Sequence, residues 1–439
     1  MDLYIAFVIF MISMIIAIVS DISMIAALLV GLVAFLIVGM RKGFTLNEMG
    51  RMSLGAIKDS LVVIKVMLII GMLTAVWRIS GTITVFVYYG MKIIMPNLFI
   101  IITFLLCCLL SYAIGTSFGV AGTVGIIFMA LARSGGVNPI ITAGAIMSGI
   151  YFGDRCSPVS SSANMVAGIT ETNIIENVKI MLKTGVLPFA IALLAYIILS
   201  VVNPINHVDQ GMIEGFEQEF NISFWSFLPA VAVIVLPLLK VGVLKAMGAS
   251  IVTAALIAWL VQGESIYAIL RTCIFGYSAD GSGLATILNG GGLVSMIEIA
   301  LILVISSSYS GIFSGTDMLK ALQDKLQSAC TKIGRFLVMI MMSVAMSCVF
   351  CNQTIGTLMC ADLLRKPYLE SGGSKEELAI DMENSVILIA CMIPWSIGCS
   401  VPLALLGVNF TAVAFAIYMY MVPICYVFTK KRWFSNEMI

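Results

Sequence analysis

The sequence has little charge and almost no histidine, and both shortages narrow what the protein can be. Asp, Glu, Lys and Arg make up 11% of the 439 residues, hydrophobic residues make up 61%, and His207 is the sole histidine. No soluble domain can hide that much apolar surface, so most of the chain must lie in a lipid bilayer. The net charge of +1 gives no support for a nucleic-acid-binding surface.

Several catalytic signatures are also missing. The chain contains no Walker A motif, so we do not expect it to pump ions with ATP on its own. It contains no H-E-x-x-H motif, which excludes a zinc intramembrane protease of that type. The eleven cysteines lie mostly in apolar runs and are interpreted as small core residues rather than a disulfide framework. We therefore predict no enzyme, no cofactor and no metal beyond a transported sodium ion.

The chain has instead a repeated pattern of residues that interrupt helices. Short motifs containing Gly, Ser, Thr and Pro recur 234 to 237 residues later in the second half. Paired interruptions in two related halves are typical of secondary transporters, whose binding site lies where the interruptions meet. The paired motifs are 80–82 (SGT) with 314–316 (SGT), 117–119 (SFG) with 354–356 (TIG), 134–136 (SGG) with 371–373 (SGG), and 157–158 (SP) with 393–394 (IP).

Apolar runs divide the chain into two halves, 1–202 and 224–439, joined by a linker over 203–223. A full crossing needs about 20 apolar residues, and several apolar arms are shorter than that. We therefore predict an all-α polytopic membrane protein with ten spans and two re-entrant hairpins. The expected spans are 4–20, 22–40, 61–79, a broken span 139–170 and 185–202, then 224–239, 241–262, 293–313, a broken span 376–402 and 403–428. The expected hairpins have arms 98–114 and 120–132 around a tip at 115–119, and arms 333–351 and 357–364 around a tip at 352–356.

Both broken spans are expected to be unwound over a short segment, at 153–162 and at 392–399. With five crossings in each half, the second half enters the membrane upside down, which makes the two halves inverted repeats. Seventeen Lys and Arg residues fall in loops on the side of the N-terminus and four on the other side. The linker, on that other side, contains Asp and Glu but no Lys or Arg. The positive-inside rule then puts both termini in the cytoplasm, with the protein in the cytoplasmic (inner) membrane of a bacterium.

Oxygen-bearing side chains gather at both predicted hairpin tips and at the first break. Sodium prefers oxygen ligands, and half-helix ends with unwound carbonyls supply them. Small residues at these positions also permit close helix packing, which is the alternative for each tip taken alone. The candidate ion- or substrate-binding residues are Thr116, Ser117, Asp154, Ser157, Ser160, Ser161, Asn164, Asn352, Gln353 and Thr354.

A few ionisable residues fall at predicted membrane depth, where they are costly unless paired or exposed to a watery path. Asp154 and Arg155 lie in the first break, and either bind the cation or hold the break by bonding freed backbone groups. Glu298 lies inside the predicted span 293–313, and Glu383 precedes the second break. Buried carboxylates are natural proton carriers, so Glu298 and Glu383 are the candidates for proton coupling. Pairing of Glu298 with Lys65 or Lys245 would instead make it structural.

The first break carries the motif 152–160 (FGDRCSPVS), and the chain resembles the NhaC-type sodium/proton antiporter family through it, through 115–119 (GTSFG) and through the late 393–395 (IPW). The resemblance implies inverted repeats with two hairpins, and a homodimer. It also adds Ser396 to the candidate site, at the position of the family's Asn after P-W. The chain departs from the family pattern in having Ser161 in place of an Asp, Ser162 in place of a Thr, and Glu383-Asn384 in place of a Glu-Asp pair.

The sequence as a whole predicts an ion-coupled secondary transporter that works by alternating access. Sodium/proton exchange is the first hypothesis, with sodium ion and proton as partners. Sodium- or proton-coupled transport of a small organic solute, a carboxylate or an amino acid, is the alternative, because a neutral Ser-rich pocket suits a carboxylate as well as a cation. A channel and an aspartyl protease fit the paired broken segments less well.

Overall fold

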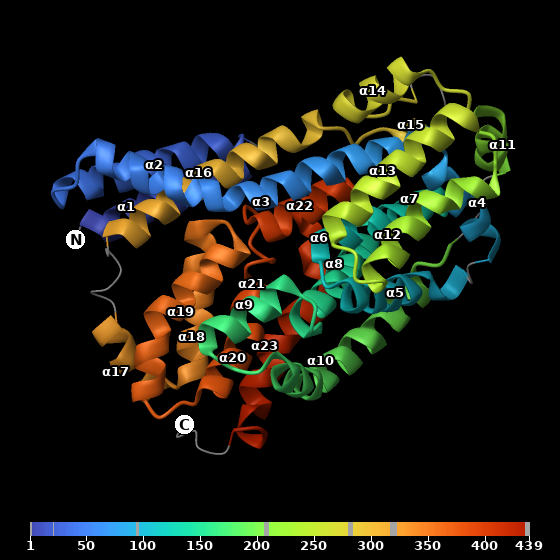
Figure 1. Ribbon diagram of the computed structural model, residues 1–439. Coiled ribbons are helices and arrows are strands. Elements are labelled where there is room, and N and C mark those ends of the chain that lie inside the picture. The colour runs from blue at the N-terminus through green and yellow to red at the C-terminus, as the bar shows by residue number, and fades with distance from the viewer. Residues whose placement is uncertain are drawn as a thin grey trace.

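The structure is a computed structural model that describes residues 2–20, 22–93, 96–205, 210–279, 284–316 and 323–434 (Figure 1). Within these ranges the chain is helical, and its extended pairing is limited to one isolated bridge between Tyr277 and Gly290. The predicted all-α class is therefore confirmed.

The helices follow one another with few long connections. In chain order they are α1 (Asp2–Val19), α2 (Met24–Arg41), α3 (Leu46–Ile79), α4 (Thr82–Ile93), η1 (Pro96–Leu98), α5 (Phe99–Ile114), α6 (Ser117–Val120), η2 (Ala121–Gly125), α7 (Ile126–Ser134), α8 (Pro139–Cys156), α9 (Ser161–Thr170), α10 (Ile174–Val202), α11 (Gln210–Glu219), η3 (Phe224–Phe227), α12 (Leu228–Leu238), α13 (Val243–Leu260), α14 (Ile266–Phe275), α15 (Ala285–Leu288), η4 (Val294–Met296), α16 (Ile297–Thr316), α17 (Gln323–Ile333), α18 (Arg335–Phe350), α19 (Gln353–Glu370), α20 (Lys375–Glu383), α21 (Val386–Ile389), α22 (Ile397–Leu406), η6 (Phe410–Phe415), α23 (Ile417–Thr429) and η7 (Lys430–Arg432).

Seven helices among the described residues are long and apolar enough to cross a membrane, or eight if the bent helix α3 counts as one span. Five of the predicted spans coincide with such helices, namely α1, α2, α10, α13 and α16. Other predicted spans, such as 139–170, 376–402 and 403–428, are divided into helices shorter than a full crossing or less apolar. These features fit a polytopic membrane protein.

The sequence misplaced some helix ends. The stretches Pro96–Ile114 and Ser117–Ser134 contain 19 and 18 residues, so the first pair of arms is not too short to cross, contrary to the prediction. The amphipathic piece before 185–202 continues without interruption into that span, giving the 29 residues of α10. Helix α3 likewise starts at Leu46 rather than near 61, and it bends by 47° between Lys58 and Val63.

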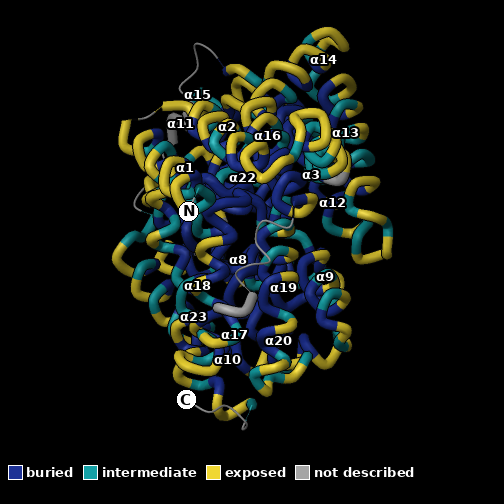
Figure 2. Tube along the Cα trace, turned by 90° about the vertical axis from the view of Figure 1, so that its left-hand side faces the viewer, coloured by how far each residue is buried: buried dark blue, intermediate teal, exposed yellow. Residues whose placement is uncertain are grey.

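Two groups of helices pack against a common centre. Helices α1, α2, α3 and α16 lie side by side on one face of the molecule (Figure 1), and Phe35 of α2 contacts the rings of Phe7 on α1 and Phe313 on α16. On the opposite side α18, α19, α20, α23 and α10 form the second group. Figure 2 shows that the deepest burial lies between the groups, around α8 and α22, while α1, α2, α13 and α14 are largely exposed.

Helix ends repeat along the chain at one constant spacing of 236 residues. Each member of a pair has the same local role, either as the residue before a helix or as the left-handed residue after one. The agreement covers six pairs of helix ends, which run from Gly115 to Asn173 in the first half and from Cys351 to Asn409 in the second. The pairs are Gly115/Cys351, Thr116/Asn352, Asn138/Ser374, Ser160/Ser396, Glu171/Gly407 and Asn173/Asn409.

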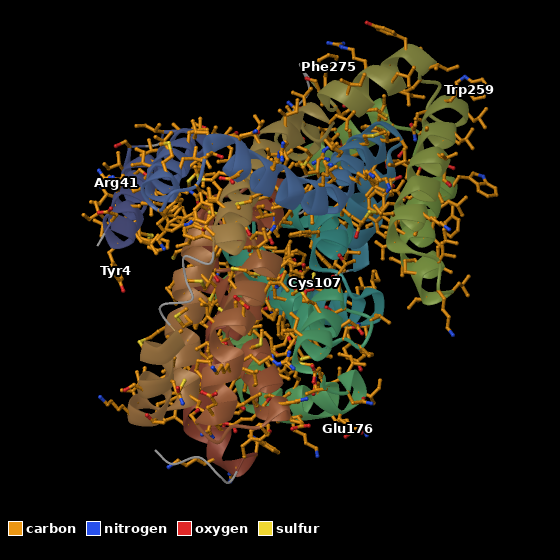
Figure 3. All side chains as sticks on the ribbon, turned by 60° about the vertical axis from the view of Figure 1, so that its left-hand side comes forward. Tyr4, Arg41, Cys107, Glu176, Trp259 and Phe275 are labelled. Atoms are coloured by element: carbon orange, nitrogen blue, oxygen red, sulfur yellow. The ribbon has the colours of Figure 1, made fainter. Side chains whose placement is uncertain are left out.

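The first break is shorter than the sequence predicted. Helix α8 continues through Gly153, Asp154 and Arg155 to Cys156, and the chain is non-helical only over 157–160. Gly153 is needed for close packing instead, because a Cβ there would lie 2.1 Å from the backbone carbon of Ser111 on α5. Cys107, which also lies on α5, is in the interior of the molecule (Figure 3). The break itself is due to Pro158, which lacks the N–H that a continuing helix requires.

The second break is close to the prediction. Helix α20 ends at Glu383, α21 adds one turn, and the chain is non-helical over 390–396 before α22 begins. The prediction of an unwound segment over 392–399 is thus correct to within a few residues. Trp395 packs there, and its Nε1 donates to the carbonyl of Cys348 on α18 at 2.8 Å.

Candidate functional site

Two helix–turn–helix tips reach the centre of the molecule. In the first, Gly115 is left-handed at φ 74° and Thr116 caps α6 by accepting from the N–H of Gly119 at 3.3 Å. In the second, Cys351 is left-handed at φ 54° and Asn352 caps α19 by accepting from the N–H of Thr354 at 2.8 Å. Both turns use the same device, a left-handed residue followed by an extended N-cap, to reverse the chain in two residues.

We expect Gly115→Ala to disable the protein. An alanine at φ 74° is strained, and its Cβ would lie 2.6 Å from the backbone carbon of Val159 in the first break. Because backbone cannot move aside cheaply, the tip must separate from the break. Yield and melting temperature in detergent should both fall, whereas Gly136→Ala, at φ 67° with open space around it, should lower stability only by the strain. Equal effects of the two changes would contradict this.

Asp154 is the centre of the candidate site. Its side chain is 3% exposed, and its Oδ1 accepts from the hydroxyls of Ser162 at 2.9 Å and Ser160 at 3.3 Å. Its Oδ2 accepts from Nε2 of Gln353 at 2.9 Å. Gln353 is the first residue of α19, so the second tip reaches the first break. The predicted meeting of a tip and a break is found for these four side chains.

Arg155 points to the other side of the break and is fully buried. Its Nε donates to Oδ1 of Asn384 at 2.9 Å, which joins the first break to the second. Its other nitrogens donate to the hydroxyl of Tyr418 at 2.8 Å and to the hydroxyl of Thr184 at 3.0 Å. Among the described residues these partners are all neutral, so no carboxylate lies in direct contact with the guanidinium.

Glu383 lies beside this pair as the last residue of α20. It is fully buried, and neither carboxylate oxygen has a hydrogen-bond partner among the described residues. It interacts electrostatically with both Arg155 and Asp154. The amide nitrogen of the next residue, Asn384, is also buried without a partner. A carboxyl group in such surroundings is costly to keep ionised unless a counter-charge comes near.

Within the described ranges, the remaining serine and asparagine candidates at the two breaks form no hydrogen bond with the carboxylate of Asp154. Ser157 and Asn164 stabilise the break, since Ser157 donates to the carbonyl of Tyr112 at 2.6 Å and Asn164 to the carbonyl of Ser160 at 2.7 Å. Ser396 occupies the N-cap position of α22 at the second break, but its buried hydroxyl makes no capping bond and has no partner among the described residues. Ser161 is exposed, and its side chain makes no hydrogen bond to the Asp154 cluster in the described part of the chain.

The tip residues Ser117, Asn352 and Thr354 lie apart from Asp154. Ser117 is buried at the start of α6, and both Asn352 and Thr354 line a cavity on the far side of the second tip. Glu298 lies in the first turn of α16, exposed, where Ser23 donates to its carboxylate at 3.4 Å. In the part of the chain that the structure describes, Glu298 forms no ion pair with Lys65 or Lys245.

Sequence reasoning missed several members of the site. Ser162 bonds Asp154 directly, and the signal for it was its place in the motif of the first break. Asn384 stood out only as a departure from the Glu-Asp pair. Thr184 and Tyr418 come from α10 and α23, and nothing in their local sequence marks them as partners of Arg155.

A second buried ionic cluster lies farther along α20. Nζ of Lys430 contacts Oδ2 of Asp381 at 2.7 Å and Oε1 of Glu377 at 2.8 Å, and Arg335 pairs with Glu377 at 3.1 Å. The hydroxyl of Tyr368 donates to Asp381, and its oxygen also lies 3.2 Å from Oε1 of Glu377. Two cations balance two anions, so the cluster ties α18, α19 and α20 to the end of α23 without a net charge. Asp381 therefore has a structural role here.

Glu171 joins the two halves at the end of α9. It pairs with Lys375 at 2.5 Å and with Arg365 at 2.6 Å. These contacts, the hydrogen bond from Lys375 first, lower the pKa of Glu171 from 4.5 to about 2. Glu171 therefore stays ionised at physiological pH and is unsuited to carrying a proton.

Broken helices whose tips and breaks meet at a buried carboxylate define the protein as a polytopic membrane transporter. A family model described as the Na+/H+ antiporter family matches residues 149–431, well over half of the chain. The chain belongs to this family, and the resemblance seen in the sequence is confirmed.

Curated relatives agree with the family while naming different cargoes. The chain is 25% identical over 390 residues to the malate-2H+/Na+-lactate antiporter of Bacillus subtilis (strain 168), covering 87% of this chain and 83% of the relative. It is 25% identical over 384 residues to the Na+/H+ antiporter NhaC of Alkalihalophilus pseudofirmus, covering 86% and 83%. It is 26% identical over 366 residues to the arginine/ornithine antiporter ArcD of Halobacterium salinarum, covering 81% and 75%.

Proposed function

We propose that this protein exchanges sodium for protons, with the sodium ion bound at Asp154. The observation that carries the proposal is the set of oxygen-bearing groups around this buried carboxylate, which come from the first break and the second tip. Hydroxyl oxygens both donate and accept, so Ser160 and Ser162 can turn their lone pairs toward a cation. When sodium binds, its contacts with Asp154 replace the hydrogen bonds that Asp154 accepts in the absence of sodium.

Gln353 must rearrange when the cation binds. Its Nε2 now donates to Asp154 and to the carbonyl of Ile387 at 2.8 Å. An amide nitrogen cannot coordinate a cation, whereas the amide oxygen can, so the side chain has to rotate. Rotation breaks the link from α19 to α21, which gives sodium a direct mechanical effect on the second tip.

Proton coupling is assigned to Glu383 because of charge balance. Without sodium, the charges of Asp154 and Arg155 cancel, and protonation of Glu383 keeps the net charge of these three residues at zero. With sodium at Asp154, the group gains one positive charge, which ionised Glu383 cancels. Because a net charge in this buried site is costly, sodium and the proton exclude each other. Glu298 is a poor second candidate, being exposed and in contact with Ser23.

Asp154→Asn should abolish sodium binding and transport while leaving the fold intact. Asparagine keeps the size and can still accept from Ser162, but it has no charge to attract the cation. Sodium-dependent proton movement in proteoliposomes and a sodium-dependent shift in melting temperature are the measurements. Asp2→Asn, an exposed carboxylate paired with Arg41 at 3.2 Å, is the control and should leave both unchanged. Sodium binding that survives in Asp154→Asn would place the cation elsewhere.

Alternating access between two inverted repeats is part of the same proposal. The six helix ends that recur at a spacing of 236 residues support a duplicated unit. The two tips and two breaks that they delimit supply the paired discontinuous helices that such transporters use. The re-entrant nature of the tips, the domain boundaries 1–202 and 224–439, and the homodimer stay predictions.

We also propose that both termini face the cytoplasm, from the excess of Lys and Arg on that side. Cysteine introduced at exposed Gln218 on α11 should react with a membrane-impermeant thiol reagent from outside intact cells. Cysteine at exposed Lys332 on α17 should react only after permeabilisation. The native cysteines are all buried, which keeps the background low. Labelling of both positions from the same side would contradict the inverted arrangement.

A further inference from the structure

We propose that the protein has a second binding site, for a small organic carboxylate, in a chamber between α3, α16 and the start of α19. The chamber has a volume of about 470 Å³, far more than one cation needs and within the range of small-molecule sites. It lies on the opposite side of the second tip from Asp154. The proposal rests on the proposed function, because the second tip forms part of both sites.

The chamber is mostly apolar with a few polar groups, the usual composition of a site for a small organic molecule. Methionine and aliphatic side chains provide the apolar wall, and hydroxyl and amide groups provide the rest. No Asp, Glu, Lys or Arg is among its described lining residues, so the site suits one charged group attached to a short apolar body. The lining residues used below are Gly55, Ser60, Ser310, Asn352, Thr354 and Leu358.

Ser310 is the strongest sign of a ligand. Its side chain is 94% buried, since 6% is exposed, and it lines the chamber on α16. Its hydroxyl has no partner among the described residues, unlike the neighbouring hydroxyl of Ser60, which bonds Ser307 at 2.5 Å. A buried hydroxyl that faces a cavity is available to donate to a bound molecule.

The start of α19 indicates that the ligand is an anion. Asn352 and Thr354 present the N-terminus of this 18-residue helix to the chamber. The N–H groups of Thr354 and Ile355 already donate to Oδ1 of Asn352. The N–H of Gln353 and the helix dipole are therefore what favour negative charge at that end. Together with the hydroxyl of Ser310 they provide recognition for a carboxylate without any basic side chain.

The second tip connects this chamber to the cation site. Asn352 and Thr354 face the chamber, while Gln353 between them bonds Asp154. A rotation of Gln353 on sodium binding therefore acts on the two residues that hold the carboxylate. Occupation of either site alters the tip that forms part of the other, which couples solute to sodium.

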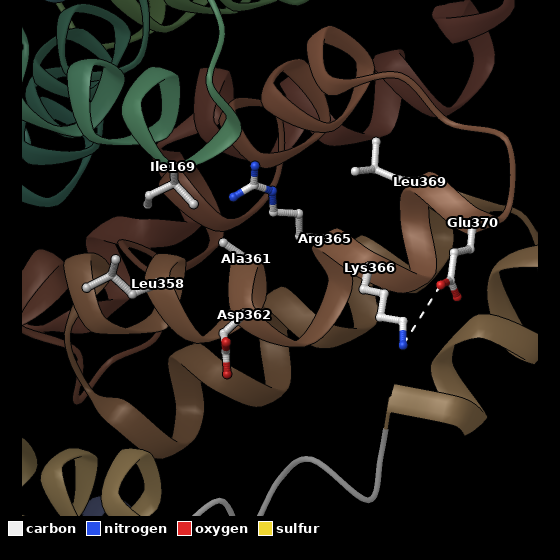
Figure 4. Close-up of a pocket in the computed structure, with 8 residues that line it drawn as sticks. All are labelled: Ile169, Leu358, Ala361, Asp362, Arg365, Lys366, Leu369 and Glu370. Carbon is white, nitrogen blue, oxygen red and sulfur yellow. Dashed lines mark ion pairs between the residues drawn. The ribbon is translucent and has the colours of Figure 1, made fainter.

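A second cavity of about 610 Å³, called here the outer cavity, lies along α19 and shares the lining residue Leu358 with the chamber (Figure 4). In the outer cavity Asp362 and Glu370 balance Arg365 and Lys366, and Lys366 pairs with Glu370 at 3.9 Å. Because these charges cancel, the outer cavity does not select for the charge of a solute. The chamber, rather than the outer cavity, therefore selects the solute by its charge, and Leu358 lies between the two cavities.

The test measures binding to the purified full-length protein by its shift in melting temperature. N-methyl-D-glucamine lactate is the carboxylate probe, N-methyl-D-glucamine chloride is its blank, and sodium chloride tests the cation site separately. Gly55→Leu fills the chamber without a backbone clash, since nothing lies within 4 Å of a Cβ at Gly55. Gly50→Leu is the matched control, because Gly50 lies on the same helix with equally open space and does not line the chamber.

We expect lactate to stabilise the wild type and Gly50→Leu but not Gly55→Leu, while sodium stabilises all three. Ser310→Ala should weaken lactate binding roughly tenfold, the loss of about one hydrogen bond, whereas Ser308→Ala on the same helix should not. Lactate binding that persists in Gly55→Leu, or no stabilisation of the wild type by lactate, acetate or malate, overturns the proposal. Loss of the sodium effect in the wild type would instead refute the cation site, so the two failures are distinguishable.

Discussion

Glu383→Gln should abolish proton-coupled transport and weaken sodium binding, because a permanently neutral residue 383 leaves the positive charge of the sodium-bound site uncompensated. Glutamine has the shape of a protonated glutamate but can never release a proton, so the site cannot exchange one cation for the other. Sodium binding to the wild type should release about one proton per ion, and the variant should release none. Proton release into weakly buffered solution and sodium flux in proteoliposomes are the measurements, and we expect the flux to fall by at least about a hundredfold, typical of the loss of an acid–base group.

Two comparison variants make this result specific. Glu376→Gln changes the same residue type on the same helix at an exposed position and should behave like the wild type. Glu298→Gln should also keep the pH dependence of transport, because Glu298 is exposed and in contact with Ser23. If Glu298→Gln rather than Glu383→Gln flattens the pH dependence, the assignment of the proton carrier is wrong.

The sequence predicted the class and the centre of the site because both depend on local signals. Apolar runs indicated the membrane, and the repeated motifs indicated where the helices are interrupted. Asp154, Ser160 and Gln353 were selected as oxygen-bearing residues at a break and at a tip, and the structure joins them by hydrogen bonds. Residues at or beside an interrupted helix could therefore be predicted from their own chemistry and their neighbours in the sequence.

Other features could not be predicted because they depend on distant packing. Gly153 looked like a helix breaker, yet α8 continues through it, since the glycine is needed for contact with α5. Thr184 and Tyr418, two side-chain partners of Arg155, lie 29 and 263 residues away in the chain and carry no motif of their own. Thr354 was grouped with Gln353 because they are neighbours, but α19 directs Thr354 to a cavity and Gln353 to Asp154.

Ser161 illustrates a related limit. Its position suggested a ligand, because an acid stands there in the family pattern. In this chain it is the exposed first residue of α9, and the neighbouring Ser160 and Ser162 bond Asp154 instead. Ser160 is the extended N-cap residue and Ser162 lies in the first turn of α9, so both reach Asp154 while Ser161 between them points away.

Arg155→Met should lower the free energy of unfolding by roughly 3–5 kcal/mol, the range for removing one member of a buried charged group. The change removes the guanidinium donor from the buried oxygens of Asn384 and Thr184. Denaturant titration in detergent, followed by tryptophan fluorescence, is the measurement. Arg51→Met, an exposed arginine on α3, is the control and should change stability by less than about 0.5 kcal/mol.

The double variant Arg155→Met/Glu383→Gln tests the charge balance of the site. In the proposed cycle Glu383 is protonated without sodium, so the two losses of stability should add. At saturating sodium Glu383 is ionised and interacts with Arg155, so removal of both should cost at least about 1 kcal/mol less than the sum. A coupling that is the same with and without sodium would mean that the charge of Glu383 does not follow the bound cation, and sodium and the proton would then not exchange at this site.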